Sequence, residues 1–178
     1  MSKKGRKRVK NGISPRRNVI SSEPTRQEKI YIDLTKYKKW TDSVKIGNFT
    51  NHLENKEEAV RHFLYILKII LAYIEENGND ILANNVKHCH VLKGKQDLLA
   101  RKIIKKMYGN KVLLDDDTNL WELGAPTEEI RIIGSFVVKV FYPLFIDHHH
   151  LIYPNKNYNN KDYGHFSYSA QNIINSSL

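Results

Sequence analysis

The chain has 178 residues, and 29 Lys and Arg against 19 Asp and Glu give it a formal net charge of +10. This length suits one domain with a hydrophobic core, and a hydrophobic content of 40% excludes a wholly disordered protein. The only cysteine, Cys89, excludes an internal disulfide framework and is typical of a reducing cytoplasm, where we expect the protein to lie. The basic excess favours a polyanionic partner such as nucleic acid.

The basic residues are concentrated at the start of the chain. Residues 1–29 hold ten Lys and Arg but only two acidic residues, so they carry +8 of the net charge. They hold few large apolar side chains, and such a segment cannot bury enough surface to offset its ordering entropy. We interpret 1–29 as a disordered basic arm, with a solvated tail that only aids solubility as the alternative. The expected phosphate contacts in the arm are Lys3, Lys4, Arg6, Lys7, Arg8, Arg16 and Arg17.

The first elements after the arm are a short strand and a long helix. Residues 30–34 alternate apolar and polar side chains, which predicts a strand. Residues 56–77 predict a helix, because Asn55 is a good N-cap and Glu58 completes a capping box. Apolar residues lie on nearly every side of its middle, which predicts a long buried helix. Its apolar run is shorter than the roughly 20 residues of a membrane span, so we expect no membrane partner.

A second helix is predicted over residues 96–108, and Gly109 ends it. At helical spacing, one face is apolar and the opposite face is cationic. We expect this basic amphipathic helix to bind phosphates together with the arm. The cations of its outer face are Arg101, Lys102, Lys105 and Lys106. An acidic turn at 115–117 follows, and it is a candidate to restrain the basic arm until a polyanion displaces it.

The rest of the body is rich in β-branched and aromatic residues, and residues 111–153 predict a small antiparallel sheet. Residues 128–145 also fit a helical stripe, so strand and helix stay open there, although Gly134 and Pro143 favour strands. We therefore expect one α+β domain over 30–154, with N-terminal helices followed by the sheet. Residues 155–178, rich in Asn, Tyr and Ser, form a C-terminal extension.

Five of the eight histidines occur in two groups. His148, His149 and His150 follow Asp147, and His88 and His90 flank Cys89. Imidazole and carboxylate groups suit zinc or another transition metal, but the spacing matches no zinc finger. We make no firm prediction of a cofactor, and the candidate is a divalent metal at the histidine cluster. The candidate ligands are Asp147, His148, His150, His165, His88 and His90.

A metal-dependent nuclease would use a histidine of this cluster as a general base on water. His148 or His149 would take that role, with Asn159, Asn160 or His165 nearby. The glycine-rich motifs for nucleoside triphosphates and dinucleotides are missing, and so is the G-x-S-x-G nucleophile elbow.

Two short strand motifs follow the basic helix, Leu120-Trp121-Glu122-Leu123 and Ile130-Arg131-Ile132-Ile133. In this order, residues 93–147 resemble RelE/HigB-type toxins, which are ribosome-associated mRNA interferases. The resemblance implies RNA cleavage on a sheet face, with Arg131 as a catalytic residue and a neutralising antitoxin as partner. Gly124 departs from the pattern, since a basic residue commonly follows L-W-E-L, and the C-terminal basic cluster of these toxins is missing.

Taken together, the sequence favours a small basic accessory protein that binds RNA or DNA through its arm and its cationic helix. Release of counterions from the phosphates would supply the affinity. Three alternatives stay open: an mRNA-cleaving toxin of RelE/HigB type, a metal-dependent nuclease using His148 and His149, and a protein–protein adaptor in a larger complex. If the protein is an enzyme, the catalytic candidates are Arg131, His148, His149 and His165.

Overall fold

The computed structural model describes residues 29–112, 114–154 and 161–172 of the chain. The expected phosphate contacts between Lys3 and Arg17 lie outside these residues. The principal elements, in chain order, are β1 (Tyr31–Ile32), β2 (Lys45–Ile46), β3 (Phe49–Thr50), α1 (Lys56–Tyr65), the π-helix η1 (Ile66–Ile70), α2 (Leu71–Glu76), α3 (Gly78–Leu82), β4 (Cys89–Val91), α4 (Lys95–Tyr108), the 3-10 helix η2 (Gly109–Lys111), β5 (Leu120–Leu123), β6 (Arg131–Val137), β7 (Val140–Asp147) and the 3-10 helix η3 (Tyr163–His165).

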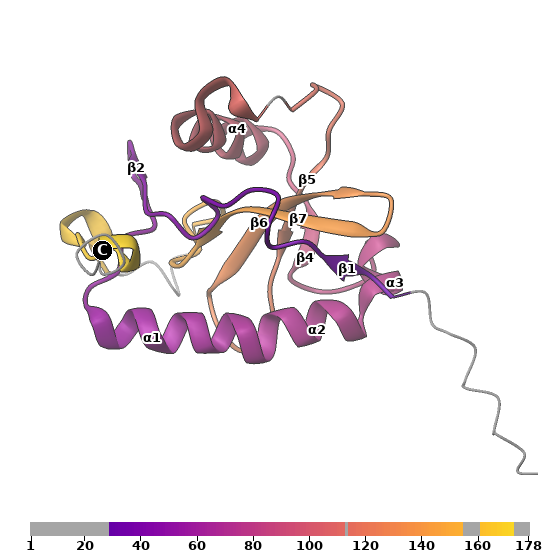
Figure 1. The fold of residues 1–178 in the computed structure, drawn as a ribbon, viewed down its shortest axis with the longest axis horizontal. Coiled ribbons are helices and arrows are strands. Elements are labelled where there is room, and N and C mark those ends of the chain that lie inside the picture. Colours follow the sequence, from indigo (N-terminus) through magenta and orange to yellow (C-terminus); the bar gives the residue numbers. More distant parts are fainter. Residues whose placement is uncertain (1–28, 113, 155–160, 173–178) are drawn as a thin grey trace, which may run out of the picture.

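The fold combines helices with a β-sheet, as the α+β prediction expects. Five of the described strands form one sheet in the order β1-β7-β6-β5-β4, in which β1 is parallel to β7 and the other pairs are antiparallel. Figure 1 shows α1 and α2 along one face of this sheet and α4 over the other. The predicted order of helices first and sheet afterwards is wrong for β1 and β4, which come before residue 111. The alternation over 30–34 does predict the strand that contains β1. The three residues of β4 leave too little alternation in the sequence to detect.

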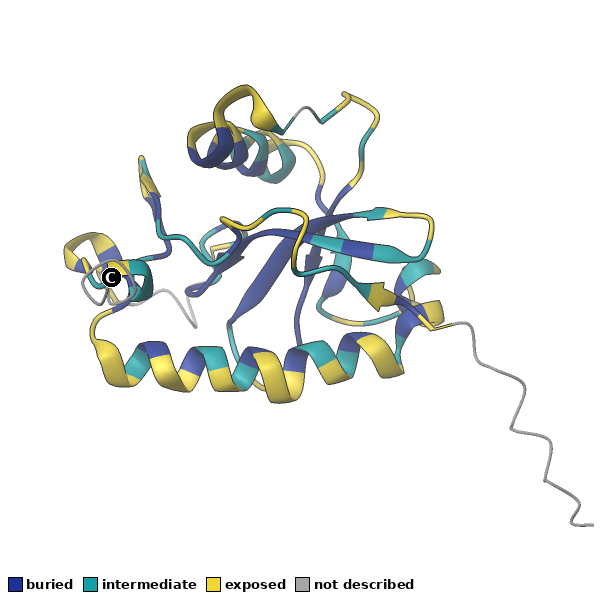
Figure 2. Ribbon diagram, in the orientation of Figure 1, coloured by how far each residue is buried: buried dark blue, intermediate teal, exposed yellow. Residues whose placement is uncertain are grey.

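One continuous helical stretch runs through α1, η1 and α2, where the sequence predicts a helix over 56–77. It begins as predicted, because the Asn55 side chain accepts the N–H of Glu58 at 2.8 Å. The five-residue π-helix η1 interrupts the α-helical pattern. The prediction of a helix buried on all sides is wrong, because one side faces solvent (Figure 2). The apolar side chains about half exposed on that side are Val60, Leu64, Leu67 and Ile69.

The two faces of the sheet bury two separate hydrophobic clusters, because side chains alternate along each strand. Ile66, Ile70 and Ile74 of the long helix pack with the residues of one face, among them Leu123 and Ile132. On the other face, α4 covers a second cluster. Its fully buried members include Ala100, Ile103, Leu120, Ile133, Leu144 and Phe145.

Helix α4 confirms the predicted amphipathic helix. It ends at Gly109, whose φ of +62° suits glycine. The buried side includes Ile103, Ile104 and Met107. The outward-facing lysines Lys102, Lys105 and Lys106 are exposed.

The segment that stayed open between helix and strand forms the hairpin of β6 and β7. The register of this pair shifts between Ile133 and Gly134, and Gly134 lies opposite Pro143. A β-carbon on Gly134 would collide with the Tyr142 carbonyl and the Phe141 ring, so only glycine fits this close approach. The glycine and the proline that favoured strands therefore mark an irregularity within them.

The predicted sheet over 111–153 is too long at both ends. Residues 111, 112 and 114 lie in no strand, and neither do residues 151–153, of which 152 and 153 form bends. The described part of the C-terminal extension is ordered by its aromatic residues, because Tyr163 and Phe166 are buried and Leu53 forms a β-bridge with Tyr168. Of the helices in the described ranges, none combines the length and apolar character that crossing a membrane requires.

Candidate functional site

The sheet face that α4 covers changes from apolar to polar along its strands. Leu120, Ile133 and Phe145 form the apolar part beneath α4. Beyond them, β4 and β5 place His90 opposite Glu122, and β6 and β7 place Arg131 opposite Asp147. Directly paired residues share a face, so these four side chains point to the same side of the sheet.

The centre of this polar cluster is Glu122. Its side chain is 1% exposed, and neither carboxylate oxygen has a hydrogen-bond partner among the described residues. Three nitrogens surround Oε1: Arg131 Nε at 3.5 Å, His150 Nε2 at 3.7 Å and His90 Nε2 at 4.0 Å. Burial, together with the negative charge of Asp147, raises the pKa of Glu122 to about 8, although Arg131 acts in the opposite direction. This carboxyl group is thus positioned to hold or release a proton near neutral pH.

Arg131 is held by its own chain beside Glu122. Its Nη1 donates to the carbonyl oxygens of Glu128 at 2.6 Å and Ile130 at 2.9 Å, and its Nη2 lies 3.3 Å from His88 Nδ1. Gly124 provides the space for this side chain, since a β-carbon there would lie 2.6 Å from Arg131 Cδ. The resemblance to RelE/HigB-type toxins implies Arg131 on a working sheet face, whereas the structure buries this guanidinium.

The turn after β7 positions His150. The Asp147 carboxylate accepts the backbone N–H groups of His149 at 3.2 Å, Leu151 at 3.0 Å and Ile152 at 2.7 Å. His150 within this turn has a φ of +55°, and its Nδ1 lies 2.6 Å from the Tyr153 carbonyl. A carbonyl oxygen only accepts, so Nδ1 carries the proton of this contact. The other nitrogen, Nε2, therefore faces Glu122.

The three consecutive histidines diverge. His148 is buried beneath α1, with its Nδ1 at 3.1 Å from Nδ1 of His62. His149 donates from Nε2 to the His52 carbonyl at 2.7 Å, and its ring stacks on Tyr163. Burial lowers the pKa of His148 well below its ordinary value and lowers that of His62 to about 3. The predicted base candidates His148 and His149 are thus neutral buried side chains away from the Glu122 cluster.

The remaining candidate ligands are distributed between these places. His165 is exposed in η3 and contacts Phe166, while His88 and His90 reach the cluster around Glu122. Within 29–112, 114–154 and 161–172, no three His, Cys, Asp or Glu side chains are grouped so that they could hold a metal ion. Asn159 and Asn160 lie outside those ranges, and a divalent metal stays a prediction.

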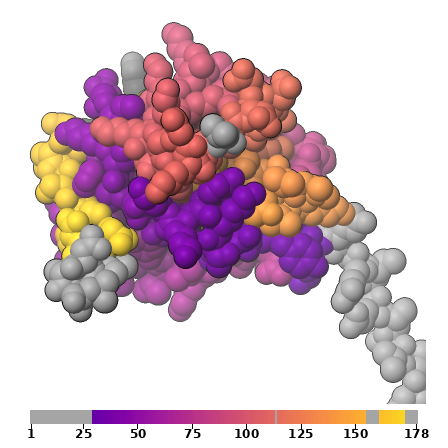
Figure 3. All heavy atoms as spheres, turned by 45° about the horizontal axis from the view of Figure 1, so that its top comes forward, coloured from indigo at the N-terminus to yellow at the C-terminus, as the bar shows by residue number. Residues whose placement is uncertain are grey.

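A cationic surface lies next to the polar cluster. Lys95 and Lys102 of α4 line a groove of about 620 Å³ together with the β2–β3 hairpin and Leu151, Ile152 and Pro154. Figure 3 turns this side of the molecule forward and shows α4 beside the 30–50 segment. The turn that carries His150 therefore contributes residues to both the groove and the polar cluster.

The other cation of the predicted face, Arg101, is used within the chain. Its guanidinium pairs with Asp97 at 2.8 Å and donates to three carbonyls of the acidic turn, those of Asp115, Asp116 and Thr118. It therefore fixes the 115–118 turn to α4. Lys106 likewise donates to the Lys45 carbonyl at 2.6 Å, which connects α4 to β2.

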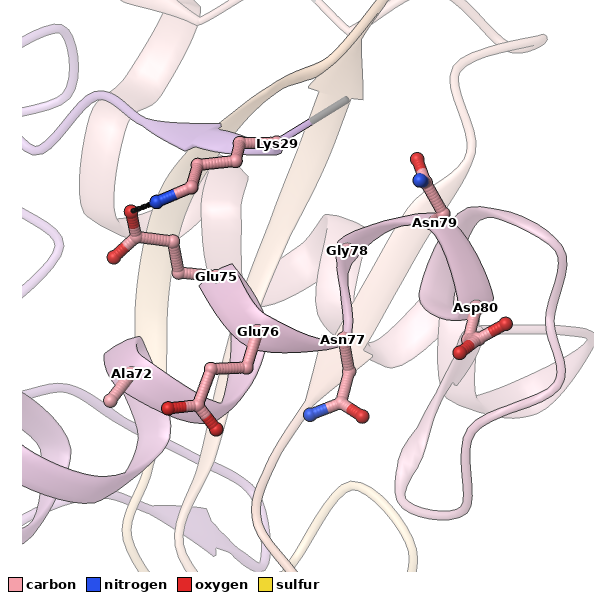
Figure 4. Close-up of a pocket in the computed structure, with 8 residues that line it drawn as sticks. All are labelled: Lys29, Ala72, Glu75, Glu76, Asn77, Gly78, Asn79 and Asp80. Atoms are coloured by element: carbon pink, nitrogen blue, oxygen red, sulfur yellow. Dashed lines mark hydrogen bonds and ion pairs between the residues drawn. The ribbon is translucent and has the colours of Figure 1, made fainter. Parts of the chain in front are cut away.

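A further pocket of about 480 Å³ lies between α2 and α3 (Figure 4). Glu75, Glu76 and Asp80 line it, and Lys29 forms an ion pair with Glu75 at 3.3 Å across it. Its exposed carboxylates do not converge on one point in Figure 4. This pocket offers no arrangement comparable to that around Glu122.

Sequence reasoning missed Glu122 and placed Arg131 only through a family resemblance. The available signal was a charged residue inside the otherwise apolar L-W-E-L strand, followed by an arginine at the start of the next strand. Because alternate strand positions often face solvent, an isolated glutamate there does not indicate a buried site.

Comparisons with known proteins give one family. A sequence model of the family described as "Uncharacterised protein UU032" matches residues 36–176, which include every residue of the polar cluster. A protein with the same description from Ureaplasma parvum serovar 3 (strain ATCC 700970) is 27% identical over 165 residues, which cover 91% of this chain and 92% of the relative. No solved structure matches the chain. These matches leave the resemblance to RelE/HigB-type toxins as a prediction.

Proposed function

The chain belongs to the UU032 family, and we propose that this member binds nucleic acid by holding the phosphate backbone against the outer face of α4. The observation that carries this proposal is the row of exposed lysines on α4 beside an open groove. Lysines contribute to nucleic-acid affinity by displacing counterions condensed on the phosphates, and this term is independent of base sequence.

The geometry of the groove supports a backbone contact. Lys95 and Lys102 lie seven positions apart on one helix, which is two helical turns, so they lie on the same side of α4. The opposite wall, formed by Ile46, Gly47 and the 151–154 segment, carries no acidic side chain. The groove therefore presents cations on one side and apolar and backbone groups on the other, which suits a sugar-phosphate strand.

The basic arm adds a second segment to this proposal. Residues 1–29 carry most of the net charge of the chain, and we assign them a phosphate-neutralising role without sequence specificity. We place the protein in the cytoplasm, because Cys89 is buried and burial raises the pKa of its thiol to about 11, as expected of a structural cysteine kept reduced.

The test compares two double variants that remove the same charge from opposite sides of the sheet. Lys102→Ala with Lys105→Ala changes the outer face of α4, while Lys56→Ala with Lys68→Ala changes exposed positions on the long helix. Fluorescence anisotropy with a 20-nucleotide RNA and the matching DNA measures Kd over a salt series. At 0.15 M salt the α4 pair is expected to lose about fourfold in affinity per lysine, and its plot of log affinity against log salt becomes shallower by about 0.7 per lysine.

The control pair is expected to leave both the affinity and the salt slope of the full chain unchanged. If both double variants bind as tightly as the unmodified chain, or if both lose the same affinity, the α4 face is not the binding surface. Deletion of residues 1–28 tests the arm separately, and the proposal expects a further loss of both affinity and salt slope.

A further inference from the structure

We propose that His90 and His150, with Glu122 between them, form an acid–base centre that cleaves RNA by transfer of the phosphodiester to the neighbouring 2′-hydroxyl. The choice of RNA as substrate rests on the nucleic-acid binding proposed above. RNA carries its own nucleophile in the 2′-hydroxyl. Its cleavage therefore needs from a protein only a base, an acid and favourable charge near the phosphate.

The distances supply the first argument. The Nε2 atoms of His90 and His150 lie 4.0 Å and 3.7 Å from one and the same oxygen of Glu122. The two imidazoles thus approach Glu122 from two elements, β4 and the turn after β7, and bracket the space around it. Access comes through His90, whose side chain is 38% exposed, whereas that of His150 is 14% exposed and that of Glu122 is 1% exposed.

Glu122 is the proton donor available to His150. Nδ1 of His150 donates to the Tyr153 carbonyl, so Nε2 is the nitrogen that faces Glu122 Oε1, at 3.7 Å. Burial raises the pKa of Glu122 to about 8, so this carboxyl group holds a proton near neutral pH that Nε2 can receive. Burial and the Arg131 charge lower the pKa of His90, which leaves that ring neutral and ready to accept a proton.

The centre also lies beside the proposed binding groove. Leu151, Ile152 and Pro154 line the groove, while His150 and Tyr153 of the same turn face the polar cluster, where the rings of Tyr153 and His90 are 5.2 Å apart. A strand held by Lys95 and Lys102 would therefore have a phosphate near this turn. His88 and His150 both have the left-handed backbone that non-glycine residues rarely adopt, with φ of +67° and +55°. Such conformations are concentrated at functional sites.

The reaction follows from these positions. His90 Nε2 takes the proton of the 2′-hydroxyl, and the 2′-oxygen forms a bond to phosphorus. The bond from phosphorus to the 5′-oxygen breaks, and that oxygen receives the Glu122 proton, which passes through Nε2 of His150. The products are a 2′,3′-cyclic phosphate and a 5′-hydroxyl. The proton on His90 then returns to Oε1 of Glu122, which restores the starting state without any change in oxidation.

Glu122 and Arg131 are positioning residues in this scheme, because neither reaches the substrate. Glu122 exchanges the proton between the two imidazoles. Arg131 provides a fixed positive charge behind them, in the space left by Gly124. A buried positive charge favours the approach of a phosphate and the negative charge that develops on it.

The experiment uses the full chain and a DNA oligonucleotide that contains a single ribonucleotide, labelled with a fluorophore at its 5′ end. Cleavage after the ribonucleotide alone, with a 2′,3′-cyclic phosphate identified by mass spectrometry, is the expected result. The same oligonucleotide with a 2′-O-methyl group must stay intact. His90→Gln, His150→Gln and Glu122→Gln are expected to lower the rate by about 100-fold or more, with Kd within about twofold of the unmodified chain. Glu76→Gln, an exposed amide substitution on α2 prepared in parallel, is expected to keep full activity. A contaminating ribonuclease would cut equally in all four preparations.

A pH profile separates the relay role of Glu122 from a structural one. The charged and titratable groups that face the centre are His88, His90, Arg131, Asp147, His150 and Tyr153. The rate of the unmodified chain should fall as the Glu122 proton is lost above about pH 8, and the residual rate of Glu122→Gln should not show that fall. The residual rate of Glu122→Gln could instead fall above about pH 8 in the same way as the rate of the unmodified chain. In that case the proton lost there belongs to another group, and Glu122 is not the relay.

The outcomes distinguish this inference from the proposed function. RNA that binds but is not cut overturns the acid–base centre and leaves nucleic-acid binding in place. RNA that neither binds nor is cut overturns both. Cleavage that is unaffected by His90→Gln and His150→Gln, or that stops when EDTA is added, overturns the assignment of the reaction to these two imidazoles.

Discussion

The raised pKa of Glu122 also predicts how the free energy of unfolding depends on pH, and Glu122→Gln tests this without any substrate. The folded protein holds a proton on Glu122 up to about pH 8, whereas the unfolded chain releases it near the ordinary value of 4.5. A raised pKa in the folded state means that stability is greatest below pH 4.5 and is lost as the pH rises through 8. The unmodified protein is therefore expected to become less stable from neutral to alkaline pH, and the glutamine variant lacks this contribution.

The magnitude follows from the two pKa values. Applied to 4.5 and about 8, proton linkage gives a loss of about 3 kcal/mol in the free energy of unfolding between pH 6 and pH 9. The full effect of about 5 kcal/mol would require acidic pH, where the buried histidines also titrate. The range from pH 6 to pH 9 therefore isolates Glu122 best.

Urea denaturation of both proteins at several pH values between 6 and 9 measures this effect. The difference in unfolding free energy between the unmodified chain and Glu122→Gln should change by about 3 kcal/mol across the range, since other titrating groups cancel in the difference. Glu76→Gln, which changes an exposed carboxylate, should show no such change. A constant difference between the unmodified chain and Glu122→Gln at pH 6 and pH 9 would refute the raised pKa.

Three more substitutions test neighbouring features. Gly124→Ala places a β-carbon 2.6 Å from Arg131 Cδ, so the guanidinium must move. We expect the free energy of unfolding, measured by urea denaturation, to fall by about 1–3 kcal/mol. An unchanged free energy of unfolding would contradict the tight packing. Burial lowers the pKa of His62 to about 3, so the free energy of unfolding falls as the pH drops below 6.5. His62→Gln should remove about 2 kcal/mol of this fall between pH 6.5 and 4.5. An equal fall in both proteins would show that His62 does not cause it. Arg101→Ala should speed amide hydrogen exchange in the 115–118 turn, because Arg101 donates to its carbonyls. It should lower nucleic-acid affinity less than Lys102→Ala does. The opposite order of affinities would make Arg101 the phosphate contact.

Local signals predicted the helices well. The Asn55 cap and the apolar spacing define the start of α1, and the separation of lysines from isoleucines defines α4, because both signals lie within a few residues. The β6–β7 hairpin was ambiguous because its apolar residues fit two periods at once. The short strand β4 gave no pattern of its own, and its place in the sheet depends on pairing with β5 far along the chain.

The candidate site was harder to predict because it depends on strand register. Glu122 meets His90 only through the pairing of β4 with β5, and meets His150 only through a turn organised by Asp147. The sequence predicted that neighbouring histidines would act together. Within the turn, however, consecutive side chains point in different directions, so His150 reaches Glu122 while His148 is buried against His62.

The π-helix η1 lets one long helix serve two unrelated neighbours. A π-turn holds one residue more than an α-turn, so the helix before it and the helix after it present faces that are rotated relative to each other. Before η1, His62 meets His148 at the end of β7; within and after it, Ile70 and Ile74 pack on the sheet. Removing one residue from 66–70 would restore a regular helix and rotate Ile74 away from the sheet. The length of this segment is therefore a constraint on the chain that single substitutions would not reveal.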